Sequence, residues 1–156
     1  MASEKVREYF SQYGLADRIL EFDVSSETVE LAAQAIGCEA KQIAKSMSFL
    51  LNDQAILVVT SGDARISNPK FKEQFKTKAK MIPPDQVEKL IGHDVGGVCP
   101  FGIHEDVVVY LDISLQRFDT VFPAAGSGNS VIELSIDELE THSRAKDWID
   151  VSKDWE

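Results

Sequence analysis

Residues 46–60, SMSFLLNDQAILVVT, carry the clearest fold signal of the sequence: two apolar runs separated by Asn52-Asp53. Short runs rich in Leu, Ile and Val that are bounded by turn residues are typical of buried β-strands. Asn and Asp favour the tight turns that reverse the chain in a hairpin. The stretch therefore predicts two antiparallel strands joined by a short turn.

Helical and strand-like patterns alternate irregularly around this hairpin. Apolar spacing, caps and stop residues predict helices over 6–13, 29–36, 39–45 and 69–76, one that opens at Pro83-Pro84 and one that follows Ser135. Further strand-like runs occupy 19–24, 107–112, 119–122 and 130–134. Because no strict βαβ rhythm is present, we expect a single α+β domain over residues 1–156, with a mixed, mostly antiparallel, barrel-like sheet surrounded by helices.

The charge of the chain is acidic overall and basic in one place. Among 156 residues, 26 are Asp or Glu and 16 are Lys or Arg, which gives a net charge of −10. Proteins that coat nucleic acids are normally basic, so we expect no DNA partner. Residues 68–80 nevertheless hold five lysines and one glutamate. This run predicts a local contact with a polyanion, and it is equally compatible with a solvated helix face.

The termini and cysteines indicate the compartment. The N-terminus is charged before any apolar run develops, and the apolar runs are of strand length, far short of a membrane span. Cys38 and Cys99 share no CxxC spacing. We therefore expect a cytoplasmic protein without membrane contact.

The titratable residues give little support for metal or thiol chemistry. His93, His104 and His142 form no HxH or HxxxH pair, so surface or loop histidines are expected rather than a metal site. Cys99 precedes Pro100, which favours extended backbone, and no base is positioned beside it in the sequence. A small buried or pocket-lining cysteine is expected; a thiol-dependent hydrolase is the alternative. No cofactor is expected.

Two glycine-rich stretches, GGVCPFG (96–102) and AAGSGNS (124–130), lack the spacing of known phosphate or dinucleotide loops. Glycines let backbone N–H groups approach a ligand closely, so the two stretches could share a pocket. A hairpin turn is the simpler interpretation of 124–130. Lys45, at the start of an apolar strand, could neutralise a phosphate or polarise an ester carbonyl, or it could simply be solvated.

Several stretches together resemble the YbaK-like aminoacyl-tRNA deacylases, relatives of the editing domain of bacterial prolyl-tRNA synthetases. In order along the chain, these stretches are AAQAIGCEAKQIAKSMSFLL, ILVVTSGD, VEKLIGHDVGGVCPFG, VVVYLD and AAGSGNSVIEL. The resemblance spans about residues 20–142 and implies a single α+β domain with a mostly antiparallel, barrel-like sheet. It also implies hydrolysis, without a metal, of the ester that joins a wrong amino acid to tRNA.

The resemblance also implies a site. It assigns a catalytic role to Lys45, against the tRNA end, and a substrate pocket to Gly96, Gly97, Val98, Cys99, Pro100, Phe101, Gly102, Asp112, Gly126, Ser127 and Gly128. The lysines that could touch the acceptor stem are Lys70, Lys72, Lys76, Lys78 and Lys80. The expected partners are the aminoacyl-tRNA acceptor end and prolyl-tRNA synthetase. Cysteinyl- or alanyl-tRNA(Pro) is the expected substrate, and a non-catalytic module that binds the tRNA end is the alternative.

Overall fold

The predicted hairpin forms the middle of the main sheet. In the computed structural model, which describes residues 4–22, 29–93, 97–127 and 129–155, β2 (Ile43–Leu51) pairs antiparallel with β3 (Gln54–Ser61). Asn52 and Asp53 make the turn with φ angles of 47° and 72°. The hairpin is therefore confirmed.

The predicted helix over 39–45 is wrong. Only the single 3-10 turn η2 (Ala40–Gln42) forms, closed by reciprocal hydrogen bonds between Glu39 and Gln42. The strand begins at Ile43, because Ile43 and Ala44 pair with β6 (Thr120–Pro123) on one side and Ala44 pairs with β3 on the other. Strand pairing on both edges overrides the local helix preference of this segment.

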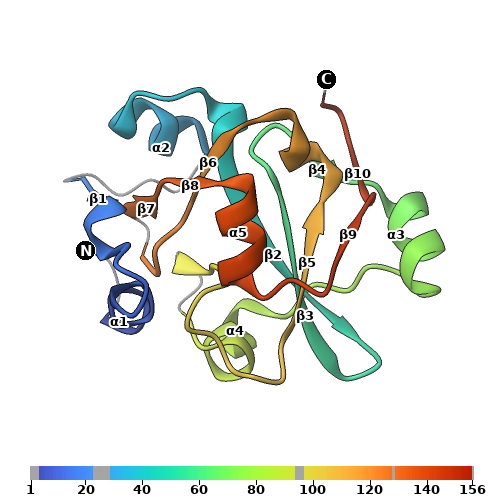
Figure 1. Ribbon diagram of the computed structural model, residues 1–156. Helices are drawn as coiled ribbons and strands as arrows, with labels where there is room; N and C mark the ends of the chain where they lie inside the picture. The colour runs from blue at the N-terminus through green and yellow to red at the C-terminus, as the bar shows by residue number, and fades with distance from the viewer. Residues whose placement is uncertain (1–3, 23–28, 94–96, 128, 156) are drawn as a thin grey trace.

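The main sheet has six strands in the order β8-β6-β2-β3-β5-β9, and it curls around the core (Figure 1). The remaining strands are β1 (Ile19–Glu21), β4 (Arg65–Ile66), β5 (Val108–Asp112), β7 (Ser130–Ile132), β8 (Leu134–Ser135), β9 (Asp147–Ile149) and β10 (Ser152–Lys153). β1 pairs with β7, and β4 with β10. Of the seven pairings between described strands, four are antiparallel and three parallel. The predicted α+β fold with a mixed sheet is confirmed.

Five α-helices surround the sheet in the described ranges: α1 (Glu4–Ser11), α2 (Val29–Ile36), α3 (Asn68–Phe75), α4 (Pro84–Ile91) and α5 (Ile136–Ser143). A single 3-10 turn, η1 (Ala16–Arg18), precedes β1, and η4 (Ile113–Arg117) follows β5. The predicted start of the last helix is confirmed, since Ser135 and Glu138 form a capping box on α5; Gly92, which was not predicted as a cap, ends α4. None of these helices is long and apolar enough to cross a membrane.

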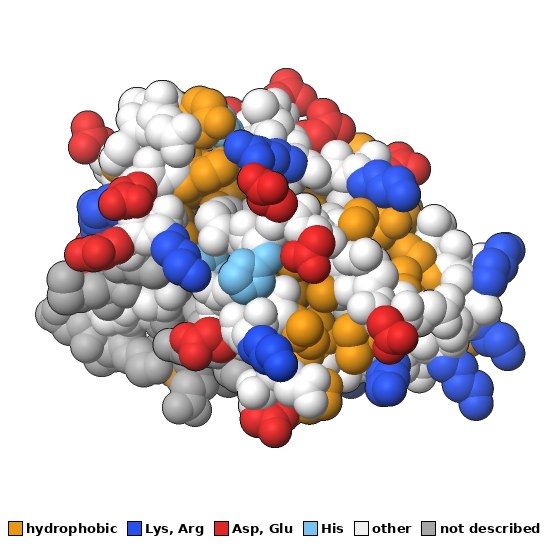
Figure 2. Space-filling view, turned by 90° about the horizontal axis from the view of Figure 1, so that it is seen from below, with side chains coloured by type: hydrophobic (Ala, Val, Ile, Leu, Met, Phe, Trp, Pro, Cys, Tyr) orange, Lys and Arg blue, Asp and Glu red, His pale blue; other side chains and the backbone are white. Residues whose placement is uncertain are grey.

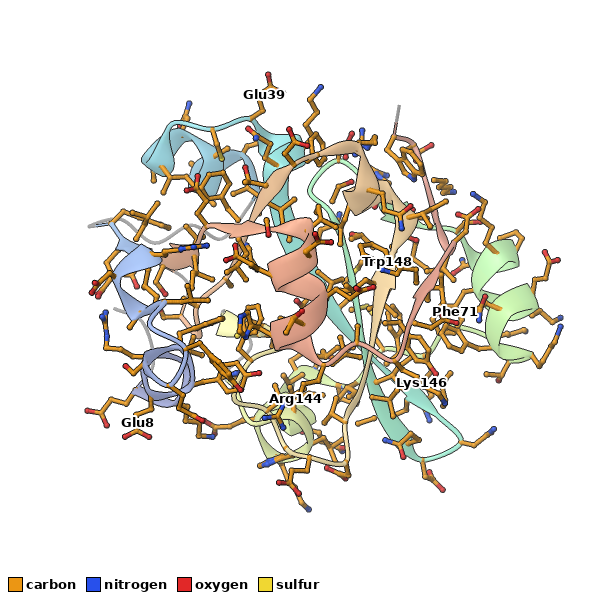
Figure 3. The ribbon with its side chains drawn as sticks, in the orientation of Figure 1. Glu8, Glu39, Phe71, Arg144, Lys146 and Trp148 are labelled. Atoms are coloured by element: carbon orange, nitrogen blue, oxygen red, sulfur yellow. The ribbon has the colours of Figure 1, made fainter. Side chains whose placement is uncertain are left out.

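The two faces of the sheet have different partners. Leu50 and Leu57 face the large core, to which α1, α4 and α5 contribute. Phe49 and Val58 face a smaller cluster that α3 covers through Phe71, which points from the helix toward the sheet (Figure 3). Since side chains alternate along a strand, Lys45 lies on the face that α3 covers.

Strands β9 and β10 were not expected from the sequence. Both hold the segment that follows α5 against the body of the protein: β9 runs parallel to β5, and Ser152 of β10 lies opposite Ile66 of β4. The segment also carries the indole of Trp148, whose Nε1 donates to Glu140 of α5 at 2.6 Å (Figure 3). This arrangement places the C-terminal segment close to the turn that follows β3.

Candidate active site

Lys45 is a half-buried cation on β2. It lies opposite Thr60 of β3, and the segments near it carry Asp63, Arg65 and Glu30. Burial lowers the pKa of Lys45 below its usual value, and Arg65 lowers it further, whereas Asp63 and Glu30 act in the opposite direction. Within the described part of the chain, the side-chain ammonium of Lys45 has no hydrogen bond or ion pair.

The second glycine-rich stretch begins beside Lys45. β6 runs parallel to β2, with Ala44 opposite Pro123, so the next residue, Ala124, is level with Lys45 on the neighbouring strand. The stretch is the turn between β6 and β7, closed by a hydrogen bond from Ala125 N to Ser130 O of 3.1 Å. The hairpin interpretation is therefore confirmed.

The described residues of that turn are held by side-chain hydrogen bonds. Gly126 adopts a φ of +89°, and the Ser127 hydroxyl lies 2.9 Å from Oδ1 of Asn129 and 2.6 Å from the Ser130 hydroxyl. Gly128 lies outside the described residues.

The first glycine-rich stretch packs against the second through its backbone. A Cβ placed on Gly97 would lie 2.4 Å from the carbonyl carbon and oxygen of Gly126 and 2.6 Å from the amide nitrogen of Ser127. Only a glycine allows this approach, so the two stretches form one continuous backbone surface. Gly96 lies outside the described residues.

The residues after Gly97 anchor the loop in the core. Phe101 is fully buried, and its ring packs on Phe10 of α1 at a centroid distance of 4.7 Å. Its carbonyl oxygen accepts a hydrogen bond of 2.6 Å from Nε2 of buried His93. Pro100 is also buried, whereas Val98 and Gly102 are partly exposed. The loop is thus a rigid wall.

Cys99 is fully buried, as the sequence predicted, and lies beside His93. Its Sγ is 3.5 Å from Nε2 of His93 and donates to the carbonyl oxygen of Phe101 at 3.7 Å. Because a carbonyl can only accept, Nε2 carries a proton and cannot take one from the thiol. Burial raises the pKa of Cys99 to about 12. These contacts do not support the thiol-dependent alternative.

The other histidines contribute no metal ligand set. His104 is exposed, but His142 is buried on α5, so the expectation of a surface or loop position is wrong for His142. Its ring lies against the aromatic side chains of α1 and Tyr13, which the sequence pattern did not reveal. Among the described residues, no group of three or more His, Cys, Asp or Glu side chains could hold a metal ion.

Two charged residues of this neighbourhood, Arg65 and Arg117, escaped the sequence analysis, and a third, Asp63, was marked only as part of a motif. Asp63 is paired with Arg117, whose Nη2 and Nη1 lie 2.6 Å and 3.2 Å from its two carboxylate oxygens. Although burial alone would raise the pKa of Asp63, hydrogen bonds from Arg117 and Ser61 lower it below its usual value. The motif VTSGD marked Asp63, but no sequence signal marked Arg117.

Asp112 anchors the C-terminal segment. It is fully buried; its Oδ1 accepts from Val151 N at 2.9 Å, and its Oδ2 accepts from Ser114 N at 3.0 Å and from the Ser152 hydroxyl. The buried carboxylate is not open to a ligand in this conformation. Its link to the site is indirect, through the segment that it holds.

The lysine run lies on and after α3, at an edge where Lys and Arg side chains gather on the right of Figure 2. Lys70 is engaged by the protein: it pairs with Asp150 at 3.0 Å and donates to Ser152 O at 2.9 Å. The exposed members are Lys72, Lys76, Lys78 and Lys80.

Two of the exposed lysines, Lys72 and Lys78, border a hollow at α3. The hollow measures about 550 Å³ and is lined by Asn68, Pro69, Lys72, Lys78 and Ala79. Lys80 O accepts a hydrogen bond from Leu50 N, five residues along β2 from Lys45. That separation is about 16 Å along the strand, so this end of the lysine run lies well away from Lys45.

The chain is similar to known proteins in sequence and in fold. The profile of the aminoacyl-tRNA editing domain family matches residues 24–141. A protein of Bacillus subtilis strain 168, the uncharacterized protein YwhH, is 52% identical over the full length of both chains. The proline–tRNA ligase of the same strain is 27% identical over 104 residues, which are 66% of this chain and 18% of the ligase.

A solved structure has the same fold over almost its entire length. The crystal structure of a protein proposed to be a trans-editing enzyme for prolyl-tRNA synthetase superposes with a TM-score of 0.86 and 27% identity, covering 98% of this chain and 99% of the other. The profile match alone covers most of the sequence, including Lys45 and both glycine-rich stretches. The chain belongs to the aminoacyl-tRNA editing domain family.

Proposed function

We propose that this protein hydrolyses the ester bond of mischarged small aminoacyl-tRNAs in trans, acting as a single editing module over residues 1–156. The observation that carries the proposal is the convergence of three segments: Lys45, the turn at Gly126 and the loop at Gly97, with Gly97 in backbone contact with Gly126. A narrow wall of backbone next to a half-buried cation suits a small aminoacyl ester with a phosphate beside it.

The proposed ester hydrolysis depends on backbone N–H groups and on one side chain, that of Lys45. Lys45 binds the terminal ribose-phosphate of the tRNA, and backbone N–H groups of the glycine-rich stretches stabilise the carbonyl oxygen as it gains negative charge. Water adds to the ester carbon, the bond to the ribose oxygen breaks, and that oxygen takes a proton from the water. The products are a free amino acid and a tRNA with an intact 3′ end. No protein nucleophile takes part.

Partners and location follow from the substrate. The acceptor end of the tRNA is the primary partner, and the exposed lysines 72, 76, 78 and 80 lie where they could contact its phosphates. Prolyl-tRNA synthetase is a second partner, since the ligase of Bacillus subtilis contains a segment similar to this chain. We place the protein in the cytoplasm, where aminoacyl-tRNAs are made and used.

The test is a deacylation assay with purified protein and a panel of charged tRNAs. We expect ester loss from cysteinyl- or alanyl-tRNA(Pro), and none above background from correctly charged prolyl-tRNA(Pro). Binding of the panel without turnover of any member would instead identify a non-catalytic module that recognises the tRNA end. Absence of both binding and turnover would remove the proposal.

A further inference from the structure

The Asp63 carboxylate could pair with the Lys45 ammonium and so compete with a ligand phosphate for it. Two carboxylates, Asp63 and Glu30, raise the pKa of Lys45, and Asp63 has the larger effect. An ammonium paired with a carboxylate must give up that partner before it can bind a phosphate, so a Lys45–Asp63 pair would weaken ligand binding. No such pair forms; Asp63 is bound elsewhere.

Arg117 provides the alternative partner. Its two terminal nitrogens contact the two carboxylate oxygens of Asp63, and Nη2 also donates to the Ser61 hydroxyl at 2.7 Å. The Ser61 hydroxyl in turn donates to Oδ1 of Asp63 at 2.6 Å. A two-point contact of this kind fixes the direction of the carboxylate as well as its charge.

The guanidinium is itself held in place. Its Nε donates to Ser114 O at 2.9 Å, and its carbon lies 4.8 Å from the ring centroids of both Phe118 and Trp155. The Trp155 indole donates to the Ser152 hydroxyl at 2.8 Å, and that hydroxyl donates to Asp112. The buried carboxylate of Asp112 is thereby connected to Arg117 through the C-terminal segment.

We propose that Arg117 is a positioning residue for Lys45: it holds the Asp63 carboxylate in a two-point ion pair and so reserves the Lys45 ammonium for a phosphate of the ligand. The identity of that ligand rests on the proposed function; the contact between Arg117 and Asp63 does not. The other charges that act on Lys45 are those of Arg65 on β4 and Glu30 on α2.

The experiment compares four proteins: wild type, R117Q, D63N and R117Q/D63N. Competitive acetylation of lysines across a pH series, read by mass spectrometry of the peptide that contains Lys45, gives the pKa of Lys45 without any substrate. Deacylation of a mischarged tRNA gives kcat and KM separately. Thermal melting reports whether each variant is folded.

In R117Q, we expect the released Asp63 to pair with Lys45. The pKa of Lys45 should rise, slowing acetylation at a fixed pH about threefold. The ratio kcat/KM should fall about fivefold or more, mainly through KM. In R117Q/D63N, the carboxylate is gone, so kcat/KM should return to within about twofold of wild type and acetylation of Lys45 should be at least as fast as in wild type, even if the melting temperature does not recover.

Two results would overturn the proposal. One is a folded double variant as impaired as R117Q, which would mean that Arg117 acts by packing or by a contact of its own. The other comes from D63N, in which the amide oxygen can still accept from Arg117: an unchanged pKa of Lys45 would show that Asp63 does not act on it. If R117Q fails to fold, the pKa of Lys45 in D63N tests the proposal by itself. If wild type deacylates nothing, the proposed function fails while the acetylation series still tests Arg117.

Discussion

Gly97 and Gly126, on loops almost thirty residues apart, touch backbone to backbone: a Cβ on Gly97 would lie 2.4 Å from the carbonyl group of Gly126. Gly97→Ala should therefore push the two loops apart, destabilise the fold by about 2 kcal/mol and abolish most deacylation. Urea unfolding and the tRNA assay measure the two effects.

Gly14→Ala is the control for this substitution. Gly14 has a φ of +71°, and a Cβ placed on it would have nothing within 4 Å. Alanine there should therefore cost about 1 kcal/mol in backbone strain without a steric clash. Activity should stay at the wild-type level in Gly14→Ala. Full activity in Gly97→Ala would show that the contact between the loops does not shape the site.

Lys45→Ala should lower kcat/KM about 100-fold, as the loss of one well-placed electrostatic contact does in other hydrolases. The matched control is Lys41→Ala, since Lys41 is exposed and its ion pair, with Glu39 at 3.4 Å, is exposed as well. Lys41→Ala should leave kcat/KM unchanged. Equal activity of the two variants would contradict the role of Lys45.

Cys99→Ala should retain most of the activity, because a buried thiol with a pKa of about 12 is not an attacking group. In the folded protein, iodoacetamide should modify partly exposed Cys38 and leave Cys99 unmodified, which peptide mass spectrometry can measure. Unfolding should expose both thiols. Complete loss of activity in a folded Cys99→Ala variant would support the thiol-dependent alternative.

Lys72→Gln with Lys78→Gln should weaken tRNA binding and reduce the slope of log affinity against log salt by about 1.5, since each phosphate contact contributes almost one. Lys70→Gln should instead lower the melting temperature, because Lys70 is tied to Asp150 and Ser152. Exposed Lys89 on α4 supplies the control for charge alone. An unchanged salt slope would assign the lysines to a solvated helix face.

His142 should make stability depend on pH. Burial lowers its pKa from the ordinary value of 6.5, so the unfolded chain binds this proton more readily than the native protein. The free energy of unfolding should therefore decrease as the pH falls below 6.5. Denaturant titrations at pH 7 and pH 5 should show a smaller difference in His142→Gln, whereas exposed His104→Gln should keep the wild-type difference.

Local signals explain what was predictable from the sequence. The hairpin around Asn52-Asp53, the helix that opens at Pro83-Pro84 and the helix capped by Ser135 form where expected, because their turn residues and apolar periods act over a few neighbours. The segment 39–45 deviates because its helix formers compete with two strand partners that lie far along the chain. Strands β9 and β10 have two or three residues each, and pairing alone defines them.

The candidate site likewise has residues that the sequence indicated and residues that it did not. Lys45 and the glycine-rich stretches were identified through a family resemblance, and the structure brings their described residues together. Arg117 carries no such signal, since its partner Asp63 is 54 residues away and its position depends on the stacked ring of Trp155. The neighbourhood of His142 was likewise invisible, because it consists of aromatic rings from another helix.

The lysines on and after α3 affect how the protein would first contact RNA. With a net charge of −10, the protein as a whole repels a phosphate backbone, whereas the edge where the lysines gather offers a local attraction. An encounter that begins there has the ligand already on the side of the sheet where Lys45 lies. We expect the same imbalance to disfavour adhesion to RNA through the rest of the surface.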